Sequence, residues 1–326
     1  MITYLLRRFF YAIPLLIGVN LITFGLFFIV NTPDDIAAVH LGQRYLTAEA
    51  ITDWKQAHGY DNPLFYNASG SGIEQFTETI FFQKSARLFV FDFGVSDEGR
   101  DISHDLNERM WPSLALAIPA LILGVLTNIS FALLIVFFRH RYLDSISVVL
   151  CVSLMSISGL FYIIGGQYLV ANLLQIVPIS GYEPGVQLIR FLVLPVLIGI
   201  LGGIGSGTRW YRTLFIEEMN KDYVRTAYAK GLSHSRVLFG HVLRNAMIPI
   251  VTGVVVLLPL LFLGSLLTES FFGIPGLGSY TIDAIQQQDF AIVRAMVFLG
   301  SILYLLGLIL TDLVYTWVDP RVRLAE

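Results

Sequence analysis

Few residues of this 326-residue chain have the types and spacing that chemistry requires. The six histidines lack the spacing of a metal site, and no His-Glu-x-x-His run is present. They are His40, His58, His104, His140, His234 and His241. A Gly-x-x-x-x-Gly-Lys-Ser/Thr run, which would cradle nucleotide phosphates, is also absent. No serine or cysteine nucleophile can be tied to a base, so we expect no catalytic residue, metal or cofactor in this chain.

Four acidic residues close to apolar segments are the remaining candidates. Asp312 lies within a predicted membrane span, where a charge is costly and suggests a proton or substrate site. Because it lies within two turns of the end of that span, near basic residues, we favour a structural ion pair. Glu269, Asp283 and Asp289 flank an external turn. There they could form a gate, bind an ammonium group or contact an external protein, and an ordinary solvated loop is the alternative.

The most informative stretch is a basic segment between two apolar ones. It consists of Asp222, Tyr223, Val224, Arg225, Thr226, Ala227, Tyr228, Ala229, Lys230, Gly231 and Leu232. A basic loop of a membrane-embedded chain could serve as a contact for a cytoplasmic protein. The alternative is an ordinary basic loop held by acidic lipid headgroups.

Periodicity predicts the local structure of this segment. An apolar ridge recurs every four residues and predicts one helix over 213–230. Its members are Phe215, Met219, Tyr223 and Ala227. Glu217 and Lys221 have the spacing of a favourable ion pair. Gly231 is predicted to end the helix in the left-handed conformation, with Leu232 making the apolar contact that accompanies such an end. A second short helix should follow, so that both lie against the membrane surface.

The amino-acid composition indicates that these residues are carried by membrane-spanning helices. Hydrophobic residues make up 55% of the chain and charged residues 14%, well below the roughly one quarter of soluble domains. We therefore predict an all-α polytopic membrane protein with six spans, each near the roughly 20 residues that cross a bilayer. The predicted spans are residues 9–30, 113–138, 145–171, 189–208, 248–271 and 292–318. The first run is too long for a signal-peptide core, and we expect it to be retained.

The predicted organisation has three parts. Residues 1–30 form the N-terminus and first span. Residues 31–112 carry 13 acidic and 6 basic residues and should fold as an external subdomain. Residues 113–326 form the core with five spans, including the cytoplasmic loop 209–247. Lysine and arginine in the short loops gather on one side, which places both termini in the cytoplasm.

Two features of the spans bear on packing. The charge-free stretch 145–182 is too long for one straight helix, so a re-entrant or interfacial piece should follow the third span. Gly199, Gly203 and Gly207 recur every four residues in the fourth span and allow another helix to approach closely. That stripe could contact another subunit or pack within this one, and the sequence does not decide between them.

Several motifs together resemble the permeases of binding-protein-dependent ABC importers, in the dipeptide/oligopeptide branch. The matching stretches are Asp222–Ala227, Ala229–Leu232, His241–Ala246, Ile248–Pro249, Leu194–Pro195, Arg209, Arg212, Thr268–Phe272, Pro275–Gly278, Asp312–Leu313, Asp319–Arg323, Gly59–Leu64 and Phe91–Gly94. The resemblance covers most of the chain. Two departures stand out: Arg225-Thr226-Ala227 replaces the general Glu-Ala-Ala opening, and Ser158-Gly159 stands where many relatives have proline.

The resemblance implies a mechanism and partners. It implies a second homologous permease subunit, two cytoplasmic ATPases that hold ATP and magnesium, and an external substrate-binding protein. The segment from Asp222 to Leu232 would seat in a groove of one ATPase and transmit its movement to the spans. The chain would itself lie in a bacterial inner membrane and translocate peptides inward. Nucleic acid is not expected among the partners.

Other functions stay open at this point. Relatives in this branch also handle nickel chelates, glutathione, antimicrobial peptides or sugars. An ion-coupled carrier would be expected to show paired broken helices in matched halves, and none is evident. A membrane-embedded enzyme would require catalytic residues gathered at one depth, which the scattered aspartates and histidines do not provide.

Overall fold

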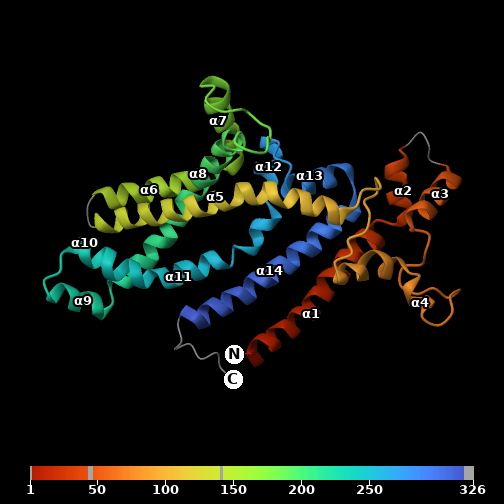
Figure 1. The fold of residues 1–326 in the computed structure, drawn as a ribbon, viewed down its shortest axis with the longest axis horizontal. Helices are drawn as coiled ribbons and strands as arrows, with labels where there is room; N and C mark the ends of the chain where they lie inside the picture. Colours follow the sequence, from red (N-terminus) through yellow and green to blue (C-terminus); the bar gives the residue numbers. More distant parts are fainter. Residues whose placement is uncertain (1, 43–46, 140–141, 319–326) are drawn as a thin grey trace. The chain divides into compact units, whose positions relative to one another are not determined.

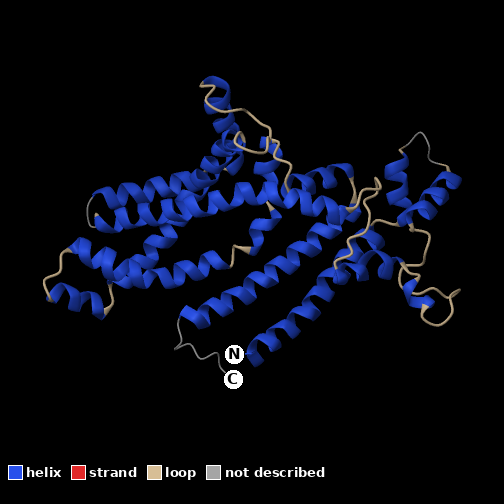
Figure 2. Cartoon of the chain, viewed as in Figure 1, coloured by secondary structure: helices blue, strands red, loops and turns tan. Residues whose placement is uncertain are grey.

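The computed structural model describes residues 2–42, 47–139 and 142–318 (Figure 1). In these ranges the chain consists of helices joined by loops, and β pairing is limited to one isolated bridge between Val95 and Asp101 (Figure 2). The predicted all-α class is confirmed. The stretch Asp319–Arg323, which resembles the permease family, lies outside the described residues.

The structure has the membrane-spanning helices that composition predicts. Within the described residues, five helices are long and apolar enough to cross a bilayer. They are Arg7–Val30, Ile102–Phe137, Leu188–Met219, His234–Leu263 and Phe290–Val314. A sixth candidate is the pair Asp144–Ser156 and Gly159–Leu173, which is bent by 85°. Each of the six predicted spans therefore has a counterpart.

The third span breaks earlier than predicted. We expected an apolar span over 145–171, but α6 (Tyr142–Ser156) ends at Ser156, and α7 (Gly159–Gly166) starts in a new direction. Ser156 turns its hydroxyl back to the Val152 carbonyl at 2.8 Å, which weakens the helix locally, and Ser158 is extended. The helical direction continues past Gly166 into a π-helical segment, Gln167–Leu173.

Two other apolar helices differ in extent from the predicted spans. Helix α5 (Ile102–Phe137) starts eleven residues before 113; its 36 residues span about 54 Å, longer than the hydrocarbon of a bilayer. The fifth apolar helix covers His234–Leu263 rather than 248–271. The helix ends before Gly264, whose φ of 70° is not helical. A separate short helix, α12 (Leu266–Phe272), follows.

The chain divides into two compact units. The first contains Met1–Arg109 and Tyr280–Leu306. It includes α1 (Ile2–Gly25) with a π-helical end (Leu26–Val30), α2 (Pro33–Leu41), α3 (Ala48–His58), α4 (Glu74–Thr77), a π segment (Phe81–Ser85), a 3₁₀ segment (Ala86–Val90), most of α13 (Leu277–Gln287) and the first part of α14 (Phe290–Val318).

Local sequence explains the helices of this first unit. Thr32 caps α2 through a capping box with Asp35, and Thr47 caps α3. Gly59 ends α3 with φ of 69°, which favours glycine. An aromatic core joins these elements to the end of α1. Its buried members are Phe24, Phe28, Ile36, Tyr60 and Ile80.

The second unit contains Met110–Ser279 and Gly307–Glu326. It includes most of α5, α6, α7, α8 (Leu188–Met219), α9 (Asp222–Ala229), α10 (His234–Val237), a π segment (Leu238–Val242), α11 (Leu243–Val255), a 3₁₀ segment (Pro259–Leu263) and α12. The end of α14 lies close to α11, because a Cβ on Gly307 would meet the Val256 carbonyl at 2.8 Å. Glycine at this position therefore allows the backbones to approach.

Candidate coupling site

The basic segment folds as a short helix separated from the fourth span. Helix α8 ends at Met219, and α9 begins at Asp222 after Lys221, whose φ of −78° and ψ of 153° are extended. The single helix predicted over 213–230 is therefore wrong. The predicted Glu217–Lys221 pair is also wrong, because the break removes the required helical spacing. Lys221 instead pairs with Glu218 at 2.5 Å.

One face of α9 is buried among the ends of the spans. Val224 is 1% exposed and Ala227 is 5% exposed. They join a core drawn from α5, α8 and the helix that begins with α10. Its other buried members are Ala132, Leu133, Val136, Tyr211, Phe215, Val237, Leu238, Val242, Ala246 and Ile250. The predicted ridge thus converges on one core even though its helix is interrupted. A displacement of α9 would be transmitted to several spans through this core.

The opposite face of α9 is open. Its exposed residues are Asp222, Arg225, Thr226, Ala229 and Lys230. Arg225 contacts Asp222 at 3.3 Å, with side chains 77% and 94% exposed. An ion pair so exposed contributes little to folding. These charges therefore remain available for a partner.

Gly231 ends α9 as predicted. Its φ is 78°, and its N–H donates to the Tyr228 carbonyl at 2.9 Å. The Leu232 N–H donates to the Ala227 carbonyl at 3.3 Å, and the Leu232 side chain packs on the core. Together these bonds form a Schellman motif. A Cβ on Gly231 would meet no atom within 4 Å, so the requirement for glycine is one of backbone conformation.

Two tyrosines fix α9 to its neighbours. The Tyr223 hydroxyl donates to Glu218 at 2.7 Å. Burial, together with this bond, raises the pKa of Tyr223 to about 12, so the hydroxyl keeps its proton at neutral pH. The Tyr228 hydroxyl lies 2.6 Å from His234 Nδ1 at the start of α10. These contacts hold both ends of α9 while its charged face stays exposed.

The structure separates the three glycines of the predicted stripe by environment. A Cβ on Gly207 would overlap the amide of Asn128 in α5, and one on Gly199 would just touch Ala120. A Cβ on Gly203 would meet nothing within 4 Å. The tightest backbone contact belongs to a glycine outside the stripe: a Cβ on Gly205 would lie 2.5 Å from the Cys151 carbonyl of α6. Packing within the chain therefore depends on Gly205 and Gly207.

We expect Gly205→Ala to destabilise the chain by about 1–3 kcal/mol, because α6 must move to admit the methyl group. Gly203→Ala is the matched control in the same helix and should leave the melting temperature unchanged or raise it, since alanine favours helix. Thermal unfolding of both variants in detergent tests this. Equal melting temperatures would show that α6 and α8 are not closely packed at Gly205.

Glu269, predicted near an external gate, is fully buried. Its Oε1 accepts from the Ser265 N–H at 3.0 Å and the Ser113 hydroxyl at 2.9 Å. Its Oε2 accepts from the N–H groups of Gly278 at 2.7 Å and Ser279 at 3.1 Å. Burial raises the pKa of Glu269, and the hydrogen bonds oppose that shift. Within this unit the carboxylate ties the start of α12 and the first turn of α13 to α5.

The other two acidic residues differ from each other. Asp283 is exposed on α13, whereas Asp289 is only 1% exposed. Asp289 accepts from the N–H groups of Asp97 at 3.1 Å and Ile292 at 3.2 Å. Burial, followed by the charge of Asp97, raises the pKa of Asp289. A role in gating or in binding an external protein stays a prediction for all three carboxylates, and Asp283 is the one that reaches the surface of its unit.

Comparison with known protein families matches residues 128–324, which include the whole of α9, to the binding-protein-dependent transport system inner membrane components. The chain belongs to this family. Residues 1–88 match the N-terminal region of such membrane components.

Individual relatives are similar along the whole permease. The dipeptide transport system permease protein DppB of Bacillus subtilis (strain 168) is 28% identical over 330 residues, which cover 99% of each chain. DppB of Escherichia coli (strain K12) is 28% identical over 353 residues with the same coverage. The glutathione transport system permease protein GsiC of Escherichia coli (strain K12) is 28% identical over 327 residues, again 99% of each chain. The chain is thus a multi-pass inner membrane protein and an ABC importer permease.

Some residues that organise this permease were not found from the sequence. Ser113 was placed only as the start of a span, although its hydroxyl bonds Glu269 and accepts from the Leu277 N–H at 2.8 Å. Gly205 lies outside the four-residue spacing of Gly199, Gly203 and Gly207, so that spacing does not predict its close contact with α6. Asn128 of α5 accepts from the Thr208 hydroxyl of α8 at 3.3 Å. A polar residue within an apolar span was the available signal for Asn128, and no local signal marks Ser113.

Proposed function

We propose that this permease imports short peptides as one of two non-identical permease subunits. Two cytoplasmic ATPases, which hold the ATP and magnesium, would complete the complex, and an external binding protein would deliver the peptide. The chain itself would bind no cofactor and catalyse no reaction. The observation that carries the proposal is the similarity to dipeptide permeases over 99% of both chains.

We further propose that α9 and Gly231 form the contact with one ATPase. Support comes from the division of α9 into two faces. Val224 and Ala227 are buried among the span ends, and the charged face is exposed. A partner seated on the exposed face would push on a helix rigidly attached to several spans. Closure of the ATPases could then shift the spans between inward-facing and outward-facing packings. We also propose that loop 209–247 and both termini lie in the cytoplasm, which the basic residues of the short loops favour.

Reconstitution tests the transport assignment. The permease should be purified with its second permease, ATPases and binding protein and placed in liposomes. Uptake of labelled alanyl-alanine should then require ATP and the binding protein. Uptake without ATP, driven by an ion gradient, would contradict the proposal. Glutathione is the second candidate substrate, because the glutathione permease is equally similar. Competition between the two labelled compounds decides between them.

Arg225→Glu tests the proposed contact. Arg225 is exposed, so its reversal should not change folding. If its charge faces the ATPase, uptake should fall about tenfold, since a reversed interface charge weakens association. Arg236→Glu is the control, because Arg236 is an exposed arginine of the same loop outside α9. Uptake and co-purified ATPase are measured for both variants. Equal losses would place the contact elsewhere in the loop.

A further inference from the structure

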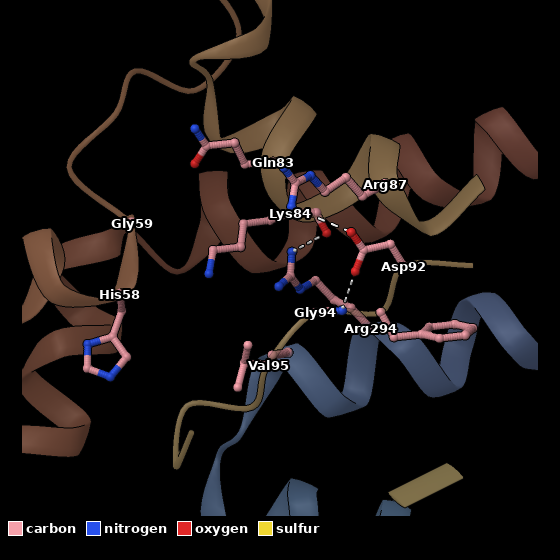
Figure 3. A pocket seen from close by; sticks show the side chains of 11 residues that line it. His58, Gly59, Gln83, Lys84, Arg87, Asp92, Gly94, Val95 and Arg294 are labelled. Atoms are coloured by element: carbon pink, nitrogen blue, oxygen red, sulfur yellow. Dashed lines mark hydrogen bonds and ion pairs between the residues drawn. The ribbon is translucent and has the colours of Figure 1, made fainter. Parts of the chain in front are cut away.

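The unit of Met1–Arg109 and Tyr280–Leu306 contains a cavity of about 380 Å³ (Figure 3). Its walls come from the end of α3, the π and 3₁₀ segments, the loop that follows them and the start of α14. The lining residues are His58, Gly59, Gln83, Lys84, Arg87, Asp92, Phe93, Gly94, Val95, Ala291 and Arg294. The family match and the resemblance assign no role to this cavity.

The lining carries more positive than negative charge. The lining includes three cations, Lys84, Arg87 and Arg294, and a single carboxylate, that of Asp92. Arg87 already pairs with Asp92 at 3.5 Å, and the Gly94 N–H donates to the same carboxylate at 3.2 Å. The ion pairs within the described residues include neither Lys84 nor Arg294. Two cations of the cavity therefore lack a carboxylate in contact.

Arg294 is held in place by neutral groups. Its side chain is 4% exposed. Nη1 donates to the Lys84 carbonyl at 3.3 Å (Figure 3). Nε donates to the Phe290 carbonyl at 3.2 Å. The guanidinium lies 4.7 Å from the ring centroid of Phe28. These contacts fix its direction without neutralising its charge.

Lys84 is held in a similar way. Its ammonium lies 4.9 Å from the ring centroid of Tyr60. Burial is the main cause that lowers the pKa of Lys84; the nearby charge of Arg294 acts in the same direction, and the charge of Asp97 opposes it. An anion placed between the two cations would oppose both effects.

The neighbouring carboxylates are engaged elsewhere. Asp97 accepts from the Tyr60 hydroxyl at 3.2 Å and lies 3.5 Å from His40. Asp289 accepts from the backbone N–H groups of Asp97 and Ile292. The charges of Asp97 and Asp289 act on these cations from nearby, but among the described residues neither carboxylate forms an ion pair with Lys84 or Arg294. Both cations can therefore still contact an anionic group from outside the chain.

We propose that this cavity binds the carboxylate of a short peptide between Lys84 and Arg294, an inference that rests on the proposed peptide import. The volume equals roughly thirteen water molecules at 30 Å³ each, which suits a ligand of about dipeptide size. Phe93, Val95 and Ala291 supply an apolar wall for its aliphatic part. Asp92 in the same cavity disfavours a doubly charged phosphate.

Calorimetry on the full chain in nanodiscs of zwitterionic lipid tests the site. The probes are alanyl-alanine, its C-terminal amide and inorganic phosphate. We expect wild type to bind alanyl-alanine at least about tenfold more tightly than the amide, because a charge-assisted contact is lost in the amide. Lys84→Gln should weaken binding of alanyl-alanine by a similar factor, and Lys84→Arg should retain it. Lys55→Gln is the control, because Lys55 pairs with Asp34 away from the cavity.

Each outcome is decisive. Equal binding of alanyl-alanine and its amide, or equal binding by wild type and Lys84→Gln, overturns the site. Lys84-dependent binding of phosphate without alanyl-alanine also overturns it. Uptake by the reconstituted complex separates this proposal from the transport assignment. If wild type imports alanyl-alanine while Lys84→Gln binds it normally, the cavity proposal alone fails. If Lys84 is required for binding but wild type imports no peptide, the site stands and the transport assignment fails.

Discussion

Gly231→Val should reduce ATP-driven uptake about tenfold while the permease still reaches the membrane. Gly231 has a φ of 78°, and a β-branched residue is a steric outlier there. The left-handed conformation costs an L-residue about 1–2 kcal/mol, and 1.4 kcal/mol is a factor of ten in an equilibrium. The population of α9 ends with both Schellman bonds closed would therefore fall relative to the open form by about a factor of ten. The expected loss comes from the position of α9, because no atom lies within 4 Å of an added Cβ.

Gly231→Asn is the matched control for this prediction. Asparagine adopts the left-handed conformation more readily than other residues with a side chain, and the surrounding space admits it. Uptake by Gly231→Asn should stay within about twofold of wild type. ATP hydrolysis by the assembled complex is measured beside uptake. Continued hydrolysis without uptake in Gly231→Val would indicate uncoupling. Normal uptake in Gly231→Val would show that the geometry of this helix end is not needed for transport.

The features that could be predicted from the sequence depend on local pattern. The helix end at Gly231 follows from a glycine between an apolar ridge and Leu232, and the structure has both Schellman bonds there. Apolar runs likewise locate the spans. The break at Lys221 could not be found in this way, because the ridge from Phe215 to Ala227 keeps its period across the break. Helices α8 and α9 both pack on one core, and the residues of the ridge face that core from both helices.

Sites built from distant segments were not predictable. Glu269 looked like a candidate for an external gate because it follows an apolar run and precedes a turn rich in glycine. Its surroundings depend on Ser113, which lies 156 residues away in sequence. They also depend on Gly264 and Gly276, where a Cβ would overlap the Glu269 carboxylate. A single sequence does not allow one to predict which distant backbone groups will surround a carboxylate in the fold.

Glu269→Ala should be among the most destabilising single substitutions in the second unit. The carboxylate accepts from three backbone N–H groups and the Ser113 hydroxyl, and it is fully buried. The hydroxyl can rotate to another acceptor, but the three N–H groups cannot. Each buried donor left without an acceptor costs about 1–3 kcal/mol, so the total should be about 3 kcal/mol or more. The melting temperature in detergent should fall by about 5 °C or more.

Glu269→Gln refines this prediction because it keeps the size of the side chain. One oxygen becomes an NH₂ group, which must face at least one of the N–H donors, so about half of the loss should remain. Asp283→Asn is the control, because Asp283 is exposed and its substitution should leave the melting temperature unchanged. Limited proteolysis within residues 264–279 reports whether this segment has loosened, because backbone that is no longer held is cut more readily. Glu269→Ala could instead keep the wild-type melting temperature and resist proteolysis at residues 264–279. That result would show that the carboxylate is not needed to hold this segment to α5. A stable, protected variant with impaired uptake would instead favour a direct role for Glu269 in transport.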